Sequence, residues 1–91
     1  MEQLKTIKEL INQGDVAEAI RQLDEYLITD STDRDEAFYL LGNAYRKQGN
    51  WQLALNNYQY AIEINPDSPA VQARKMAIDI LNFYHKDMFN Q

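Results

Sequence analysis

The chain has 91 residues, of which 45% are hydrophobic and 25% are charged, and this is the balance of one ordinary globular domain. The formal net charge of -5 would repel a phosphate backbone, so nucleic-acid binding is not expected. Cysteine is absent, which excludes disulfides and thiolate metal sites. No apolar run approaches the length of a membrane span, and the amphipathic N-terminal segment lacks the apolar core of a signal peptide. We therefore expect a cytoplasmic protein.

Two amphipathic helices are predicted in the first third of the chain, over residues 2–13 and 16–29. Gly14 separates them and suits the left-handed residue that ends many helices. Asp15, followed by Glu18 three residues later, predicts a capping box at the start of the second helix. Each helix carries one apolar stripe at helical spacing. The stripes consist of Leu4, Ile7, Leu10 and Ile11 in the first helix and of Val16, Ala19, Ile20, Leu23, Tyr26 and Leu27 in the second.

Two further helices are predicted over residues 34–48 and 51–64, on either side of Gly49 and Asn50. Thr32 or Asp33 is the expected N-cap of the first, and Pro66 cannot continue the second. Large apolar residues alternate with very small ones in this pair, which lets two helix backbones approach closely. The pattern is formed by Phe38, Leu41, Gly42 and Tyr45 in one helix and by Ala54, Leu55, Tyr58, Ala61 and Ile62 in the other.

A fifth helix is predicted over residues 69–84, because Ser68 is a good N-cap and Pro69 is favoured at the first helical position. Residues 85–91 form a tail that either extends this helix or makes a short turn with Met88 and Phe89 folded back. The apolar residues Phe83, Tyr84, Met88 and Phe89 either offer a docking or dimer surface, or Phe83 or Tyr84 packs on the fourth helix and the rest is disordered. No segment alternates apolar and polar residues with a period of two, so the chain is expected to be all-α.

The first two helices and the next two are copies of one unit. Gly14 and Gly49 stand 35 residues apart, as do Ala19 and Ala54. A helical pair repeated at a period of about 34 residues is typical of stacked repeat arrays.

Residues 35–68 resemble the tetratricopeptide repeat, whose pattern is W-x2-L-G-x2-Y followed by A-x3-F-x2-A-x4-P. The matching residues are Phe38 (for Trp), Leu41, Gly42, Tyr45, Ala54, Tyr58 (for Phe), Ala61 and Pro66. Residues 1–34 match more loosely, as a degenerate first repeat, and residues 69–84 resemble the capping helix that closes such arrays. The resemblance implies one domain over residues 1–84, built as a right-handed superhelical stack of two repeats (1–34 and 35–68) and a capping helix (69–84), with residues 85–91 as its tail.

The resemblance also implies a peptide-binding groove, which in this family is lined by one face of the first helix of each repeat. The asparagines and basic side chains would hold backbone or carboxylate groups, and Leu4, Ile11 and Tyr39 would supply apolar contact. The carboxylate clamp of chaperone-binding members is not expected, because Leu4 and Tyr39 stand where that clamp needs a Lys. The implied groove residues are Leu4, Lys8, Ile11, Asn12, Tyr39, Asn43, Arg46, Lys47 and Arg74.

No residues form a convincing catalytic or metal-binding pattern. His85 is the single His and has no Cys nearby, so the usual zinc spacings are missing. Ser31 and Ser68 are better explained as turn and cap residues than as nucleophiles. The acidic segment 30–36 lacks the Gly and the spacing of a calcium-binding loop. We therefore expect neither an enzyme nor a resident cofactor or metal.

The predicted function is a protein–protein interaction module or adaptor, which binds a peptide or helix of an unidentified partner protein in its concave groove. The alternative is a self-assembling structural module that forms a weak homodimer or a larger homo-oligomer through its end faces or its C-terminal aromatics. Neither nucleic acid nor a membrane is an expected partner.

Overall fold

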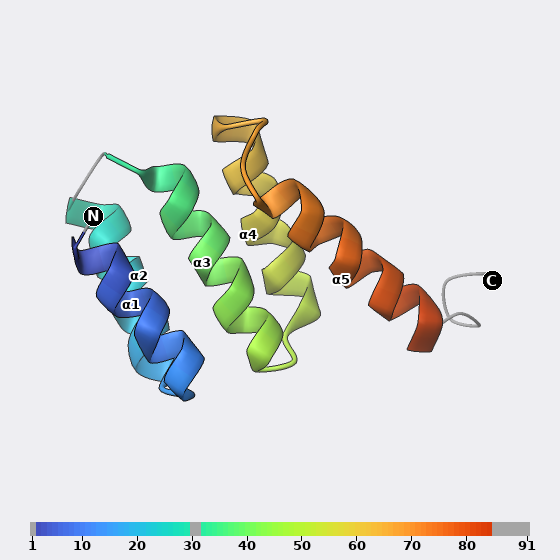
Figure 1. Cartoon of the computed structure of the whole chain (residues 1–91), viewed down its shortest axis with the longest axis horizontal. Helices are drawn as coiled ribbons and strands as arrows, with labels where there is room; N and C mark the ends of the chain where they lie inside the picture. The colour runs from blue at the N-terminus through green and yellow to red at the C-terminus, as the bar shows by residue number, and fades with distance from the viewer. Residues whose placement is uncertain (1, 30–31, 85–91) are drawn as a thin grey trace.

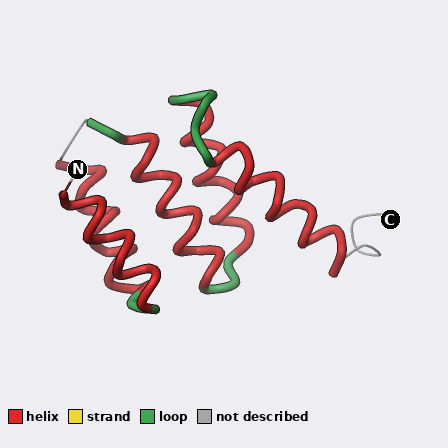
Figure 2. Tube along the Cα trace, in the orientation of Figure 1, coloured by secondary structure: helices red, strands yellow, loops and turns green. Residues whose placement is uncertain are grey.

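The structure is a computed structural model that describes residues 2–29 and 32–84. This part of the chain contains no strand, and it forms five helices joined by short loops (Figures 1 and 2). The helices are α1 (Glu2–Gln13), α2 (Val16–Thr29), α3 (Arg34–Lys47), α4 (Trp51–Ile64) and α5 (Ala70–Tyr84). Their bounds agree with the predicted ones to within one residue, so the all-α prediction is confirmed. The expectations for Ser31, His85, Met88 and Phe89 lie outside the described residues.

Consecutive helices pack against each other as antiparallel neighbours, and α1 and α5 also contact α3. In Figure 1, α1, α3 and α5 lie toward the viewer and α2 and α4 lie behind them. The C-terminal half of α5 extends away from the other helices in this view. The arrangement is the helix-turn-helix packing of tetratricopeptide repeats, with α3 at the centre of the stack.

The core consists of two buried clusters, one among α1, α2 and α3 and the other among α4 and α5. Phe38 and Tyr45 of α3 are half-buried and pack against both clusters, so they join the two halves of the stack. These contacts make α3 the helix that connects the two core clusters. Its fully buried positions include three residues that the repeat signature does not contain, and the whole set is Ala37, Leu40, Leu41, Gly42 and Ala44.

The two inter-helix turns close in the same way, 35 residues apart. Gly14 and Gly49 both have a positive φ, 93° and 79°, as expected for glycine at a helix C-terminus. In each turn the glycine N–H and the next N–H donate to carbonyl groups of the preceding helix. The bonds are Gly14 to Ile11 (3.1 Å) and Asp15 to Leu10 (2.9 Å) in the first turn, and Gly49 to Arg46 (2.9 Å) and Asn50 to Tyr45 (2.9 Å) in the second.

The capping box expected at the start of α2 is wrong. The N–H of Asp15 already donates to the Leu10 carbonyl oxygen, so Glu18 has no free backbone donor to reach. The Glu18 carboxylate instead accepts hydrogen bonds from Arg21 (2.7 Å) and Gln22 (2.8 Å) on the surface of α2. The turn thus satisfies the donor that a capping box would have used.

The starts of the later helices follow the sequence more closely. Asp33 is the N-cap residue of α3, but it has φ 50° and its side chain makes no capping hydrogen bond. The Asn50 side chain accepts from the Leu53 N–H at 3.2 Å, and the Ser68 hydroxyl oxygen accepts from the Ala70 N–H at 3.0 Å. The predicted cap Ser68 therefore acts through its side chain and the predicted cap Asp33 does not, while Asn50 is a side-chain cap that was not predicted.

Close packing between α3 and α4 depends on Gly42. A Cβ placed on Gly42 would lie 2.9 Å from Cζ of Tyr58 and closer still to two other ring carbons. The Tyr58 side chain is fully buried. The small residue of the signature therefore makes room for the aromatic ring of the next helix, as the pairing of large and small residues predicted.

Candidate interaction groove

Two cavities lie side by side between α1 and α3. The larger has a volume of about 330 Å³ and reaches the turn between α4 and α5. The smaller has a volume of about 90 Å³ and lies toward the C-terminal ends of α1 and α3. Both are lined by Lys8 and Leu40, so they are neighbours, and together they are called the groove below. The larger cavity is also lined by Asp35, Glu36, Tyr39, Ser68 and Pro69, and the smaller by Ile11, Asn12, Asn43, Arg46 and Lys47.

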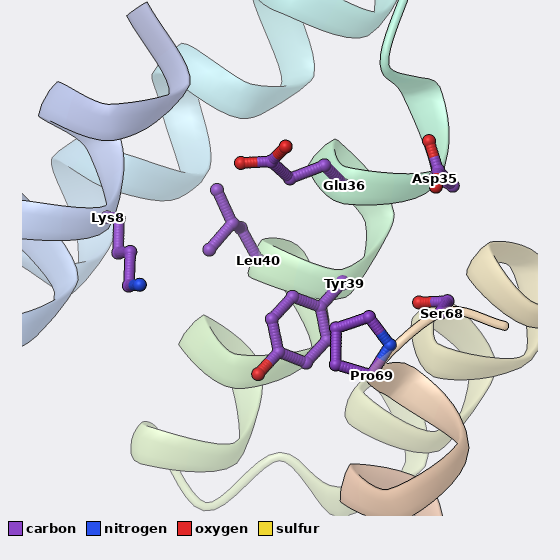
Figure 3. A pocket seen from close by; sticks show the side chains of 7 residues that line it. All are labelled: Lys8, Asp35, Glu36, Tyr39, Leu40, Ser68 and Pro69. Atoms are coloured by element: carbon purple, nitrogen blue, oxygen red, sulfur yellow. The ribbon is translucent and has the colours of Figure 1, made fainter. Parts of the chain in front are cut away.

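The groove has an apolar floor and a polar rim. Leu40 is 2% exposed and forms the floor, while Lys8 is exposed between the two cavities. Figure 3 shows the Tyr39 and Pro69 rings side by side on one wall of the larger cavity and the Glu36 side chain extending from α3 toward α1. An extended peptide could lay one side chain on this floor while its backbone met the polar rim.

A residue of the buried core orients the side chain of Asn43 in the groove. The Tyr58 hydroxyl donates a hydrogen bond to Oδ1 of Asn43 at 2.6 Å. The amide oxygen of Asn43 is therefore occupied, and its Nδ2 group remains as the donor for the groove. Burial raises the pKa of Tyr58 to about 12, although the positive charge of Arg46 opposes this shift. The hydroxyl thus stays a donor at all physiological pH values.

The charges of the groove are separated along α3. Asp35 and Glu36 lie in the first turn of α3, and Arg46 and Lys47 lie in its last turn. One carboxylate oxygen of Asp35 accepts from Nδ2 of Asn65 at 3.0 Å, which ties the start of α3 to the end of α4. The groove is therefore acidic at the larger cavity and basic at the smaller one.

Seven of the nine predicted groove residues line the two cavities. Ile11 is only 3% exposed and contributes little surface, because it belongs to the buried stripe of α1. The seven residues are Lys8, Ile11, Asn12, Tyr39, Asn43, Arg46 and Lys47.

Two predicted groove residues lie elsewhere. Leu4 is completely buried in the cluster of α1, α2 and α3, so its assignment as an apolar groove contact is wrong. The offset of 35 residues equates Leu4 with Tyr39, but Leu4 is packed against α2 and α3 whereas Tyr39 is half-buried and lines the larger cavity. Arg74 on α5 is half-buried and lines neither cavity, and its Nε is buried without a hydrogen-bond partner among the described residues.

Five residues that line the groove were not predicted from the sequence. Glu36 and Leu40 lie seven and three residues before Asn43, on the same helix stripe, so helical spacing could have identified them. Ser68 and Pro69 lie 21 and 22 residues beyond the end of α3 in sequence, and only the fold brings them to the larger cavity. Asp35 lies in the first turn of α3, where its charge complements the helix dipole, and it also lines this cavity.

Within residues 2–29 and 32–84, no group of three or more His, Cys, Asp or Glu side chains could hold a metal ion. No helix in the same ranges is long and apolar enough to cross a membrane.

Comparison with known proteins relates the chain to a repeat family. Residues 35–68 match the family model described as tetratricopeptide repeat. Two relatives are the Photosystem I assembly protein Ycf3 of Synechococcus sp. (strain CC9902) and that of Synechococcus sp. (strain CC9605), which are 39% and 36% identical over 61 residues. These matches include 65% of this chain but only 35% of each relative, so the chain spans about a third of their length.

A solved structure is similar over the whole chain. The solution NMR structure of Bacteroides fragilis protein BF1650 is 70% identical, with a TM-score of 0.90. The match covers 100% of this chain and 92% of that one. The match at residues 35–68 and the helix-turn-helix packing of α1–α5 show that the chain contains a tetratricopeptide repeat.

Proposed function

We propose that this chain is a protein–protein interaction module that holds an extended peptide or a helix of a partner protein in the groove, and so acts as an adaptor. The proposal is based on one observation. Two neighbouring cavities combine a buried apolar floor at Leu40 with charged side chains at Lys8, Glu36 and Lys47. These three side chains form no hydrogen bond or ion pair within the described part of the chain. They are available to a ligand.

The comparisons support the general role and leave the partner open. Stacked helical repeats present extended concave surfaces to other proteins. The Ycf3 relatives are named as assembly proteins, and an adaptor brings proteins together in the same general sense. Since this chain spans only 35% of those relatives, we extend to it the adaptor role alone.

The proposal can be tested by affinity capture from the source cell with the wild-type chain and two matched variants of α1. The groove variant is Lys8→Ala with Asn12→Ala, and the control is Lys5→Ala with Gln3→Ala, which changes the charge equally at exposed positions outside both cavities. A protein captured by the wild type and the control but lost with the groove variant would support the proposal. Equal capture by all three chains would refute binding through the groove.

Self-assembly is a second candidate, because α5 exposes apolar side chains at the end of the stack. Val71 is 43% exposed, Met76 54% and Phe83 78%. A second copy could cover this surface in the way that a following repeat would. Sedimentation equilibrium across a hundredfold range of concentration, with Met76→Lys for comparison, provides the test. A wild-type chain that stays monomeric throughout would exclude this function.

A further inference from the structure

The larger cavity is suited to a basic side chain of a partner. Its walls and floor are the faces of Tyr39, Leu40 and Pro69, which can pack against the methylene groups of a Lys or Arg. The carboxylates of Asp35 and Glu36 and the ammonium of Lys8 line the same cavity, so its charged side chains are net negative. Glu36 is exposed and has no ion pair among the described residues, so its charge is not neutralised within the chain.

The smaller cavity is suited to a carboxylate. It is lined by the cations of Lys8, Arg46 and Lys47, and none of them forms an ion pair within residues 2–29 and 32–84. Asn43 adds its Nδ2 group, because its oxygen accepts from the Tyr58 hydroxyl. The charged groups of this cavity are thus all hydrogen-bond donors, and the fixed amide adds another, which favours an acceptor-only ligand group.

The helix dipole accounts for the order of these charges but does not neutralise them. Acidic residues in the first turn and basic residues in the last turn each stabilise α3 through its dipole. The dipole carries only about half a charge at each end. The carboxylate of Glu36 and the ammonium of Lys47 therefore remain to act on a ligand that lies along α3.

The distance between the charged side chains at the two ends of α3 determines how long a bound peptide segment must be. Glu36 and Lys47 are eleven residues apart on α3, which corresponds to about 16 Å along the helix axis at ~1.5 Å per residue. An extended peptide covers this distance in about five residues, since each residue advances ~3.3 Å.

We propose that the groove binds an extended partner segment that carries a basic side chain and, about five residues away, an acidic side chain, with the basic one in the larger cavity and the acidic one in the smaller. This proposal rests on the interaction function proposed above and adds the chemistry and the orientation of the partner segment. The opposite charges at the two cavities would admit one direction of the segment and disfavour the other.

Three blocked hexapeptides test the proposal. They are acetylated and amidated Lys-Ala-Ser-Ala-Ser-Glu, the same peptide with Lys at both ends, and the same peptide with Glu at both ends. Binding to the 15N-labelled chain is followed by NMR titration at low salt. We expect the Lys-to-Glu peptide to bind at least about fivefold more tightly than the other two, with shifts at the residues that line the two cavities.

Variants of the chain should switch this preference. Glu36→Lys makes the groove basic at both ends and should favour the peptide with two Glu residues. Lys47→Glu replaces one of the three cations of the smaller cavity by a carboxylate and should reduce the preference for the Lys-to-Glu peptide over the peptide with two Lys residues. Asp79→Lys, an exposed change on α5 outside both cavities, should keep the wild-type preference.

Equal binding of the three peptides, binding of none, or an unchanged preference in Glu36→Lys would overturn the charge-polarised groove. The capture experiment answers a separate question. A partner that is lost with the Lys8→Ala, Asn12→Ala variant while the peptides show no charge preference would leave the interaction function standing and refute this inference alone.

Discussion

The Tyr58 hydroxyl lies 2.6 Å from Oδ1 of Asn43 and donates a hydrogen bond to it, so a residue of the buried core determines how a groove residue is oriented. The repeat signature has Phe at this position, which has no hydroxyl. The same Tyr58 ring also packs over Gly42, so one side chain both joins α3 to α4 and orients the donor of the smaller cavity.

Replacing Tyr58 by Phe should keep the fold and lower its stability by about 1 kcal/mol, the net value of a typical hydrogen bond. The melting temperature should fall by roughly 4–8 °C. The Asn43 side-chain amide signals should shift in the NMR spectrum, because the oxygen loses its donor. Tyr60→Phe is the control, since the Tyr60 hydroxyl makes no hydrogen bond among the described residues. Equal melting temperatures for the two variants would contradict this assignment.

Tyr58 should make the fold less stable at alkaline pH. Burial raises the pKa of Tyr58 to about 12 from an ordinary value of 10.0. Between these values the unfolded chain has lost the proton and the folded chain still holds it, so stability falls as the pH rises. The free energy of unfolding, measured by urea denaturation from pH 9 to pH 12, should decline more steeply for the wild type than for Tyr58→Phe. Parallel curves would show that Tyr58 does not titrate abnormally.

Gly42→Ala should destabilise the chain, although alanine is the better helix former by about 1 kcal/mol. The added Cβ would meet the Tyr58 ring, and overpacking of this kind costs about 1–3 kcal/mol. The net loss should be about 1 kcal/mol by thermal denaturation. In a Tyr58→Leu background the same change should be neutral or stabilising, because the ring is gone. A wild-type background in which Gly42→Ala raises stability would rule out the close contact.

Asn50→Ala should cost about 1 kcal/mol, since the Asn50 side chain caps α4 by accepting from the Leu53 N–H. Gln52→Ala in the first turn of the same helix is the control and should change stability by less than about 0.5 kcal/mol. Chemical denaturation of both variants provides the measurement. A smaller loss for Asn50→Ala than for Gln52→Ala would show that the cap is not a stabilising contact.

The carboxylate of Glu18 should lend stability that disappears in acid. Hydrogen bonds from Arg21 and Gln22 lower its pKa from 4.5 to about 2. The contribution is therefore present above about pH 4.5 and is lost as the pH falls toward 2. Because the pair is exposed, the effect should be small and should shrink in salt. Melting temperatures of the wild type and Glu18→Gln should converge as the pH falls from 5 to 2, and a constant difference would count against the shift.

Helix positions could be predicted from the sequence because they depend on local signals. Gly14, Gly49 and Pro66 mark helix ends, and Ser68 is a cap whose side chain forms the expected bond. The repeat offset then related the two helical pairs, and identical turn hydrogen bonds confirm that relation.

The groove could be predicted only in part, because burial depends on neighbours that a local pattern does not contain. Leu4 and Tyr39 are equivalent in the repeat, but Leu4 is buried and Tyr39 lines the larger cavity. Ser68 and Pro69 reach that cavity only because α5 folds back on α3. The sequence pattern thus identified every residue of the smaller cavity except Leu40, but only Lys8 and Tyr39 of the larger one.

The packing of each helix mainly on its chain neighbours has a consequence for how the molecule folds. Within residues 2–29 and 32–84, the only contacts between non-consecutive helices are those of α3 with α1 and with α5. Contacts that are so close in sequence cost little loop entropy, and helical domains with low contact order fold in microseconds to milliseconds. Each helical hairpin can form before the next, so the stack can grow or open from one end while the α3–α4 pair stays intact.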